Sequence, residues 1–160
     1  MVNNIAVRSG TQADLPQVLE LIKELAEFTG YLDQVKTTVE QMQIDGFGEK
    51  PVFGFLVATR EGEIIGISIY YYRYSTWKGR RLYLEDLVVR ESERGKGIGK
   101  LLFNATMKQA LSDNCTGMMW QVLHWNEKAI AFYEKYGSHF DKEFVNCNLE
   151  ADQMKNFITD

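Results

Sequence analysis

Cysteine and long apolar runs are both scarce in this sequence. The two cysteines, Cys115 and Cys147, form no metal-ligand spacing, so we expect free thiols in or near a core and no metal site. No stretch approaches the ~20 apolar residues that a membrane-spanning helix needs, so no membrane partner is expected. The N-terminus lacks the basic-then-apolar layout of a secretory signal, and a cytoplasmic location is therefore expected.

An excess of positive charge is also absent. The net charge of −4 and the sequence pI of about 5.3 argue against a nucleic-acid partner, which usually presents a basic patch. An acidic surface is compatible with cationic substrates because it raises their local concentration. With 160 residues, 45% hydrophobic and 25% charged, the chain is expected to form one globular domain over residues 1–160.

Three closely spaced glycines lie at a predicted strand-to-helix turn, Arg94-Gly95-Lys96-Gly97-Ile98-Gly99. The apolar run 82–89 before it predicts a buried strand, and residues 101–111 after it have helical spacing. Such a turn exposes backbone N–H groups at a helix N-terminus, which favours a phosphate or pyrophosphate; a plain structural turn is the alternative. The P-loop is excluded because Leu101 stands where Ser or Thr is needed, and the dinucleotide fingerprint has another glycine spacing.

The remaining periodicity predicts the order β-α-α-β-β-β-α-β-α-β with a helix after it, and hence an α/β fold with a mixed sheet and helices on both faces. Residues 45–48 are expected to form a loop. Thr11 to Asp14 and Thr37 to Glu40 have the form of capping boxes that start helices. Strands are expected at 5–8, 53–59, 64–74, 81–89, 118–123 and 143–149, and helices at 11–30, 37–44, 97–112, 126–136 and 151–158.

The motifs together resemble the GNAT family of N-acetyltransferases. Arg94, Gly97 and Gly99 match the Arg-x-x-Gly-x-Gly pattern of that family's acetyl-CoA pyrophosphate loop. Tyr83-Leu84-Glu85-Asp86 and Trp125-Asn126-Glu127 resemble the diamine acetyltransferase subfamily, which includes the spermidine/spermine N1-acetyltransferases. Segment 74–80 is most similar to the thialysine N-acetyltransferase branch.

The resemblance implies that acetyl-CoA enters a V-shaped splay between two central parallel strands of a GNAT fold. Backbone groups of Leu87, Val88 and Val89 would then bind the pantetheine arm and the acetyl carbonyl. Further cofactor contacts are implied for Asn126, Ala129 and Tyr136. The pyrophosphate would be held by Arg94, Gly95, Lys96, Gly97, Ile98, Gly99 and Lys100.

Two side chains match the family's catalytic positions. Tyr133 would protonate the departing CoA thiolate or donate a hydrogen bond to it; a core tyrosine is the alternative. Glu85 would bind the substrate ammonium, whose pKa is ~10.4, and accept its proton. Strand alternation points Glu85 and Asp86 to opposite faces unless a bulge intervenes. An ion pair with Arg81 is the alternative role for this pair, and the resemblance assigns no role to His124.

A primary amine of a small cationic molecule is the expected acceptor. Thr29 and Ser75 stand where the polyamine enzymes carry acidic residues, which favours thialysine-like amino acids, with diamines or polyamines next. A protein N-terminal or lysine acetyltransferase and a non-catalytic acyl-CoA sensor are the alternatives. The resemblance also implies a homodimer. The substrate-binding candidates are Phe28, Thr29, Trp77, Glu85, Asp86 and Trp120.

Overall fold

The fold is built on one five-stranded sheet, seen in a computed structural model that describes residues 4–158. The first four strands pair antiparallel as neighbours, and the fifth joins the fourth in parallel. The mixed sheet confirms the predicted α/β class. In spatial order, which is also chain order, the strands are β1 (Ala6–Ser9), β2 (Gly54–Arg60), β3 (Glu63–Ser75), β4 (Gly79–Val89) and β5 (Met118–Trp120).

The chain divides into two compact units, the first ending at Gln121 and the second beginning at Val122. The second unit carries α4 (Glu127–Glu134) and α5 (Ala151–Phe157). The single domain expected for residues 1–160 stays a prediction. The first unit carries the sheet, the helices α1 (Leu15–Thr29), α2 (Val39–Phe47) and α3 (Ile98–Ser112), and the short 3-10 helices η1 (Gln12–Asp14), η2 (Leu32–Gln34) and η3 (Glu91–Glu93).

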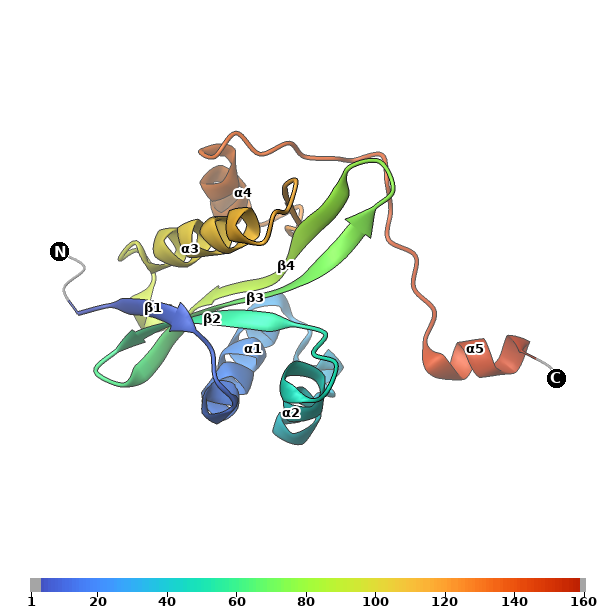
Figure 1. Cartoon of the computed structure of the whole chain (residues 1–160), viewed down its shortest axis with the longest axis horizontal. Coiled ribbons are helices and arrows are strands. Elements are labelled where there is room, and N and C mark those ends of the chain that lie inside the picture. Colours follow the sequence, from blue (N-terminus) through green and yellow to red (C-terminus); the bar gives the residue numbers. More distant parts are fainter. Residues whose placement is uncertain (1–3, 159–160) are drawn as a thin grey trace. The chain divides into compact units, whose positions relative to one another are not determined.

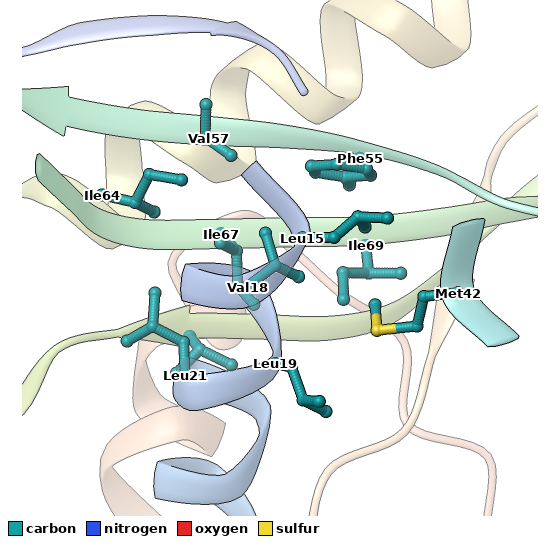
Figure 2. Packing of buried hydrophobic residues seen from close by; sticks show 11 residues of the cluster. Leu15, Val18, Leu19, Leu21, Met42, Phe55, Val57, Ile64, Ile67 and Ile69 are labelled. Carbon is teal, nitrogen blue, oxygen red and sulfur yellow. The ribbon is translucent and has the colours of Figure 1, made fainter. Parts of the chain in front are cut away.

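Within the first unit, helices cover both faces of the sheet, as predicted (Figure 1). One face packs against α1 and α2, and Figure 2 shows Val18 of α1 beside Ile67 of β3 and Met42 of α2 near Ile69 of the same strand. The other face packs against α3, where Ser68 and Thr106 share a buried hydrogen bond of 2.6 Å. The α1 side of the core consists of Leu15, Val18, Leu19, Leu21, Met42, Phe55, Val57, Ile64, Ile67, Ile69 and Val88.

The predicted capping box at Thr11 starts the 3-10 helix η1, which leads directly into α1 at Leu15. The backbone N–H of Thr11 donates to Asp14 Oδ2 over 2.7 Å, and Arg8 pairs with the same carboxylate at 2.7 Å. The Arg8 guanidinium holds the pKa of Asp14 well below its usual range. Gly30 ends the helix in the left-handed conformation, with φ of 82°, as expected for a helix C-cap. These two ends fix the length of α1, which matters for the site described below.

The structure corrects two boundaries in the first unit. The second helix is capped by Thr38, which accepts the N–H of Gln41, rather than by Thr37. It continues to Phe47, so the loop predicted at 45–48 is wrong for residues 45–47 and right only for Gly48. Gly46 is tolerated there because it packs closely on Phe53, where a Cβ would lie 2.8 Å from the ring.

One strand predicted near the end of the chain is shorter than expected, and another is absent. The strand expected at 118–123 ends at Trp120, and residues 143–149 form no strand. Phe144 and Val145 are 77% and 81% exposed, and a strand needs a paired neighbour to be stable. The predicted final helix is confirmed as α5, while the helix expected at 126–136 is regular only as far as Glu134.

Candidate functional site

The parallel strands β4 and β5 separate soon after they meet. Their ladder joins Leu82 to Met118 and ends where Leu84 meets Trp120. Beyond that point β4 continues for five residues to Val89, so within the described residues the β5-side edge of this stretch has no strand partner. Strand alternation turns the backbone N–H and C=O groups of Leu87 and Val89 toward this open edge, whereas those of Val88 face Ile67 on β3. The groups of Leu87 and Val89 fit the arrangement expected for the pantetheine-binding strand, and the role of Val88 stays a prediction.

A β-bulge sits at the start of this open edge. Ile69 pairs with Asp86 and Tyr70 pairs with Leu84, so Glu85 is the extra residue without an opposite partner on β3. The bulge breaks the two-residue alternation that would send Glu85 and Asp86 to opposite faces. The expectation that Glu85 and Asp86 point to opposite faces held only for a regular strand, so it does not apply here.

Both acids lie on the face that carries the stacked rings of Tyr71 and Tyr83, whose centroids are 5.0 Å apart. Burial, followed by the charge of Glu85, raises the pKa of each phenol, and Asp86 raises that of Tyr83 as well. Asp86 is itself half-buried, and burial together with the charge of Glu85 raises its pKa to about 6. Two carboxylates beside two aromatic rings can bind an organic cation.

The glycine loop has the conformation that the sequence predicted. Gly95 and Gly97 have φ of 77° and 83°, which L side chains rarely adopt, and a Cβ on either would meet nothing within 4 Å. Gly97 caps α3, whose first intrahelical bond runs from Leu101 N–H to Gly97 O over 3.1 Å. The N–H groups of residues 98–100 thus have no partner within the helix, and open space lies beside the loop for an anion.

Three cations surround this loop. The Nε of Arg94 donates to Val89 O over 3.1 Å, which ties the loop to the end of β4. Lys96 donates to Ser92 O at 3.0 Å and pairs with Glu93 at 3.3 Å, and Lys100 is exposed in the first turn of α3. Gly99 is half-buried, and a Cβ there would make only an ordinary contact of 3.8 Å with Val89. The loop therefore combines helix N–H groups with positive charge, which matches a pyrophosphate.

The second unit carries the remaining cofactor and acid candidates on or next to α4. Asn126 caps α4 by accepting the N–H of Ala129 over 3.2 Å. Tyr133 is buried, and burial raises the pKa of its phenol to about 12. Burial also raises the pKa of Tyr136, which is half-buried next to Phe132 at a ring-centroid distance of 5.4 Å. The roles of these four residues stay predictions.

The aromatic substrate candidates are spread along the first unit rather than gathered. Trp77 is 87% exposed at the tip of the β3–β4 hairpin, whereas Phe28 contacts Arg94 beyond the other end of β4. The eleven residues of β4 span about 35 Å between these ends. Trp120 packs edge-on against Phe103 of α3 at 5.3 Å. One chain alone thus does not bring the three rings together around an amine.

Thr29 makes local bonds at the end of α1. Its hydroxyl donates to the carbonyls of Leu25 and Ala26, at 3.1 Å and 3.2 Å. These contacts complete the last helical turn before Gly30, which gives the residue a structural role in the helix end. Its substrate role stays a prediction.

Comparison with known proteins identifies the family and the fold. The model of the acetyltransferase (GNAT) family matches residues 17–138, which include the sheet from β2 onward, the open edge and the glycine loop. The chain belongs to the GNAT family. Among its relatives is a thialysine N-epsilon-acetyltransferase of Mus musculus, 39% identical over 160 residues that cover 93% of this chain and 94% of that protein.

A second relative is human spermidine/spermine N(1)-acetyltransferase-like protein 1, 33% identical over 139 residues, 82% of this chain and 20% of that protein. Among solved structures, an aminoglycoside acetyltransferase from an uncultured soil sample superposes with a TM-score of 0.77. It is 21% identical and covers 93% of this chain and 97% of that one, which shows a shared fold. The protein is an acetyl-transferring enzyme, as predicted, and acetyl-CoA is the cosubstrate of GNAT acetyltransferases.

Residues 4–158 lack the features of two other kinds of site. No helix there is long and apolar enough to cross a membrane. The same residues contain no group of three or more His, Cys, Asp or Glu side chains able to hold a metal ion. Both cysteines are free thiols, as predicted, and Cys115 is buried. Cys147 is exposed, so the expectation that both lie in or near a core is wrong for Cys147.

Sequence reasoning missed Tyr71 and Tyr83 as site residues. The signal was present, because a hairpin turn at 76–78 pairs Ser75 with Gly79. Counting back from that turn places Tyr71 opposite Tyr83, and antiparallel partners share a face. The bulge at Glu85 could not be counted in the same way, since nothing in the residue types fixes where the extra residue falls.

Proposed function

We propose that this GNAT enzyme moves the acetyl group of acetyl-CoA directly to a primary amine of a small cationic substrate. Thialysine-like amino acids are the first candidates, with diamines or polyamines next. The observation that carries the proposal is the bulge at Glu85 and Asp86, which sets two carboxylates at the start of the open β4 edge. The names of the relatives, a thialysine enzyme and a spermidine/spermine enzyme-like protein, support the same substrate class.

The cofactor side of the proposal uses backbone groups. Leu87 and Val89, on either side of Val88, offer hydrogen bonds along the open edge, which fits the amide-bearing pantetheine arm and the acetyl carbonyl. The loop from Arg94 to Lys100 would hold the pyrophosphate through N–H groups and side-chain charge. The fit rests on the open space beside Gly95 and Gly97 and on the unused N–H groups of the first turn of α3.

On the amine side, Glu85 and Asp86 would bind the ammonium and take its proton, directly or through water. Proton transfer from an amine of pKa ~10.4 to an ordinary carboxylate of ~3.9 costs about 9 kcal/mol. With the pKa of Asp86 at about 6, the same transfer costs about 6 kcal/mol. The raised pKa makes Asp86 a better proton acceptor for the substrate ammonium, a role that the family resemblance implies for Glu85. The neutral amine can then attack the thioester held beside it.

Tyr133 would assist the departing thiolate. Burial raises the pKa of Tyr133 to about 12, whereas a thiol has an ordinary pKa of ~8.5. Complete proton transfer to the sulfur would therefore cost about 5 kcal/mol, which favours a hydrogen bond to the thiolate. Asn126, Ala129 and Tyr136 are proposed to contact the cofactor from the same unit, on the strength of the family resemblance.

The protein is also proposed to be a homodimer. Exposed aromatic side chains on the β3–β4 hairpin support this, since Tyr74 and Trp77 are 76% and 87% exposed. Light scattering on the purified protein tests it, and a monomer at micromolar concentration would refute it. A cytoplasmic location stays a prediction from the sequence.

The reaction is tested by a panel of amines with release of free CoA as readout. Thialysine, a diamine, spermidine and a lysine-containing peptide are each given with acetyl-CoA. Selective turnover of a small amine supports the proposal, and turnover of the peptide alone makes the enzyme a protein acetyltransferase. Acetyl-CoA binding without turnover of any amine would make the chain an acyl-CoA sensor.

A further inference from the structure

One face of α1 contacts the start of β3, the segment that follows β4 and the glycine loop itself. The side-chain oxygen of Gln17 accepts the N–H of Ile64 at the start of β3, over 3.0 Å. Glu24 lies two turns further along the helix, and Phe28 lies one turn beyond Glu24, so all three share a face. The family resemblance assigned Phe28 to the substrate and gave Glu24 no role.

Glu24 holds the segment that joins β4 to the glycine loop. Its Oε1 accepts the backbone N–H of Glu91, the first residue of η3, over 2.7 Å. Its Oε2 lies 3.8 Å from the guanidinium of Arg90, and both side chains are partly buried, with 26% and 34% exposed. A hydrogen bond from a backbone N–H to a carboxylate is charge-assisted and stronger than a neutral one. Glu24 thus fixes the chain immediately before the loop.

Phe28 holds the loop itself. The guanidinium of Arg94 lies over the Phe28 ring, 5.1 Å from its centroid, which is within the range of a cation–π contact. The Nε of the same arginine donates to Val89 O at 3.1 Å. Arg94 is therefore held on two sides before any anion arrives.

We propose that Glu24 and Phe28 are positioning residues that keep the pyrophosphate loop in its binding shape. The proposal rests on the proposed function, in which this loop binds acetyl-CoA. The loop residues 94–97 are exposed and include two glycines at positive φ, so holding them in one shape costs conformational entropy. Contacts from α1 order the loop in advance and so reduce the entropy lost when the cofactor binds.

The test separates cofactor affinity from turnover. Glu24→Ala is expected to weaken acetyl-CoA binding about tenfold, or ~1.4 kcal/mol, by calorimetry, with kcat at saturating acetyl-CoA within twofold of wild type. Glu24→Gln keeps an oxygen that can accept the Glu91 N–H, so it should recover most of the affinity. Glu20→Ala, at an exposed glutamate one turn earlier on α1, is the matched control and should bind as wild type does.

Phe28→Leu keeps an apolar side chain but removes the ring face. It should raise KM for acetyl-CoA severalfold and leave KM for the amine unchanged. A raised amine KM with a normal acetyl-CoA KM would overturn the role given to Phe28 and return it to the substrate pocket. Unchanged acetyl-CoA affinity in Glu24→Ala would overturn the role given to Glu24. The same result would follow if Glu24→Gln lost as much acetyl-CoA affinity as Glu24→Ala.

The failure of this inference differs from a failure of the proposed function. If wild-type protein binds acetyl-CoA and Gly97→Ala weakens that binding, the loop is the cofactor site whatever Glu24 does. Normal affinity in Glu24→Ala and Phe28→Leu would then refute only the positioning role. Wild-type protein that binds no acetyl-CoA would refute the proposed function itself.

Discussion

Asp86 should make the folded protein lose stability as the pH rises, and Asp86→Asn should remove that loss. Burial, followed by the charge of Glu85, raises the pKa of Asp86 from an ordinary 3.8 to about 6. A carboxyl group with a raised pKa in the folded state favours folding when it is protonated. Below about pH 4 the Asp86 carboxyl is protonated in both the folded and the unfolded protein. Between about pH 4 and 6 it ionises in the unfolded protein first, so the folding stability falls. Above pH 6 it is ionised in both, and the loss of folding stability is complete.

The magnitude follows from the shift. About two pKa units at 1.36 kcal/mol each give a loss of about 3 kcal/mol between pH 4 and pH 7. Asparagine has nearly the same shape and carries no charge, so Asp86→Asn should be more stable than wild type at pH 7.5 by up to about 3 kcal/mol. At pH 4 the variant and wild type should differ by less than about 0.5 kcal/mol.

Urea unfolding followed by circular dichroism at pH 4, 5, 6 and 7.5 measures this difference. Asp33→Asn, at an exposed aspartate in η2, is the control for a general loss of negative charge and should leave the pH dependence unchanged. Glu85→Gln should flatten the profile in part, because the charge of Glu85 is the second cause of the shift. If Asp86→Asn and wild type lose stability in parallel from pH 4 to pH 7.5, Asp86 is not held in the environment described.

Three further predictions concern catalysis. Gly97→Ala should weaken acetyl-CoA binding at least tenfold, measured by calorimetry. The control is Gly62→Ala, which places alanine at a similar positive φ in the open β2–β3 turn. Both variants should lose ~1 kcal/mol of folding stability, but Gly62→Ala should keep its affinity for acetyl-CoA. Tyr133→Phe should lower kcat about 10²-fold with little change in acetyl-CoA binding, and near-normal turnover with chemistry rate-limiting would make Tyr133 a packing residue. Glu85→Gln should raise KM for the amine, lower kcat and shift the pH optimum upward; normal amine kinetics would leave Asp86 as the acid that matters.

The parts of the fold that the sequence predicted are those governed by local chemistry. The capping box at Thr11 starts η1, which leads into α1, and the left-handed Gly30 ends α1; both signals are local in the sequence. The positive φ at Gly95 and Gly97 follows from glycine at a strand-to-helix turn. The 143–149 strand was wrong because its apolar residues gave a strand pattern, while pairing depends on a neighbour that local sequence cannot supply.

The site needed tertiary information in the same way. The glutamate at position 24 looks like any helix-surface acid in the sequence, and its contact with the Glu91 N–H spans 67 residues of chain. The bulge at Glu85 is a matter of register between β3 and β4, which residue types leave open. Family motifs identified the two acids, and only the strand pairing showed that they share a face.

The β-bulge, which puts both acids on one face, accounts both for the proposed proton acceptor and for the predicted loss of folding stability as the pH rises. A regular strand would send one acid to each face, where their charges would act on each other less. The bulge puts both beside Tyr71 and Tyr83, where burial and mutual repulsion raise the pKa of Asp86 to about 6. The same ~3 kcal/mol that would destabilise the ionised folded state lowers the cost of taking a proton from the amine by an equal amount. A cationic substrate bound between the two carboxylates would relieve their repulsion. Binding the amine should therefore recover much of the folding stability that is lost when Asp86 ionises.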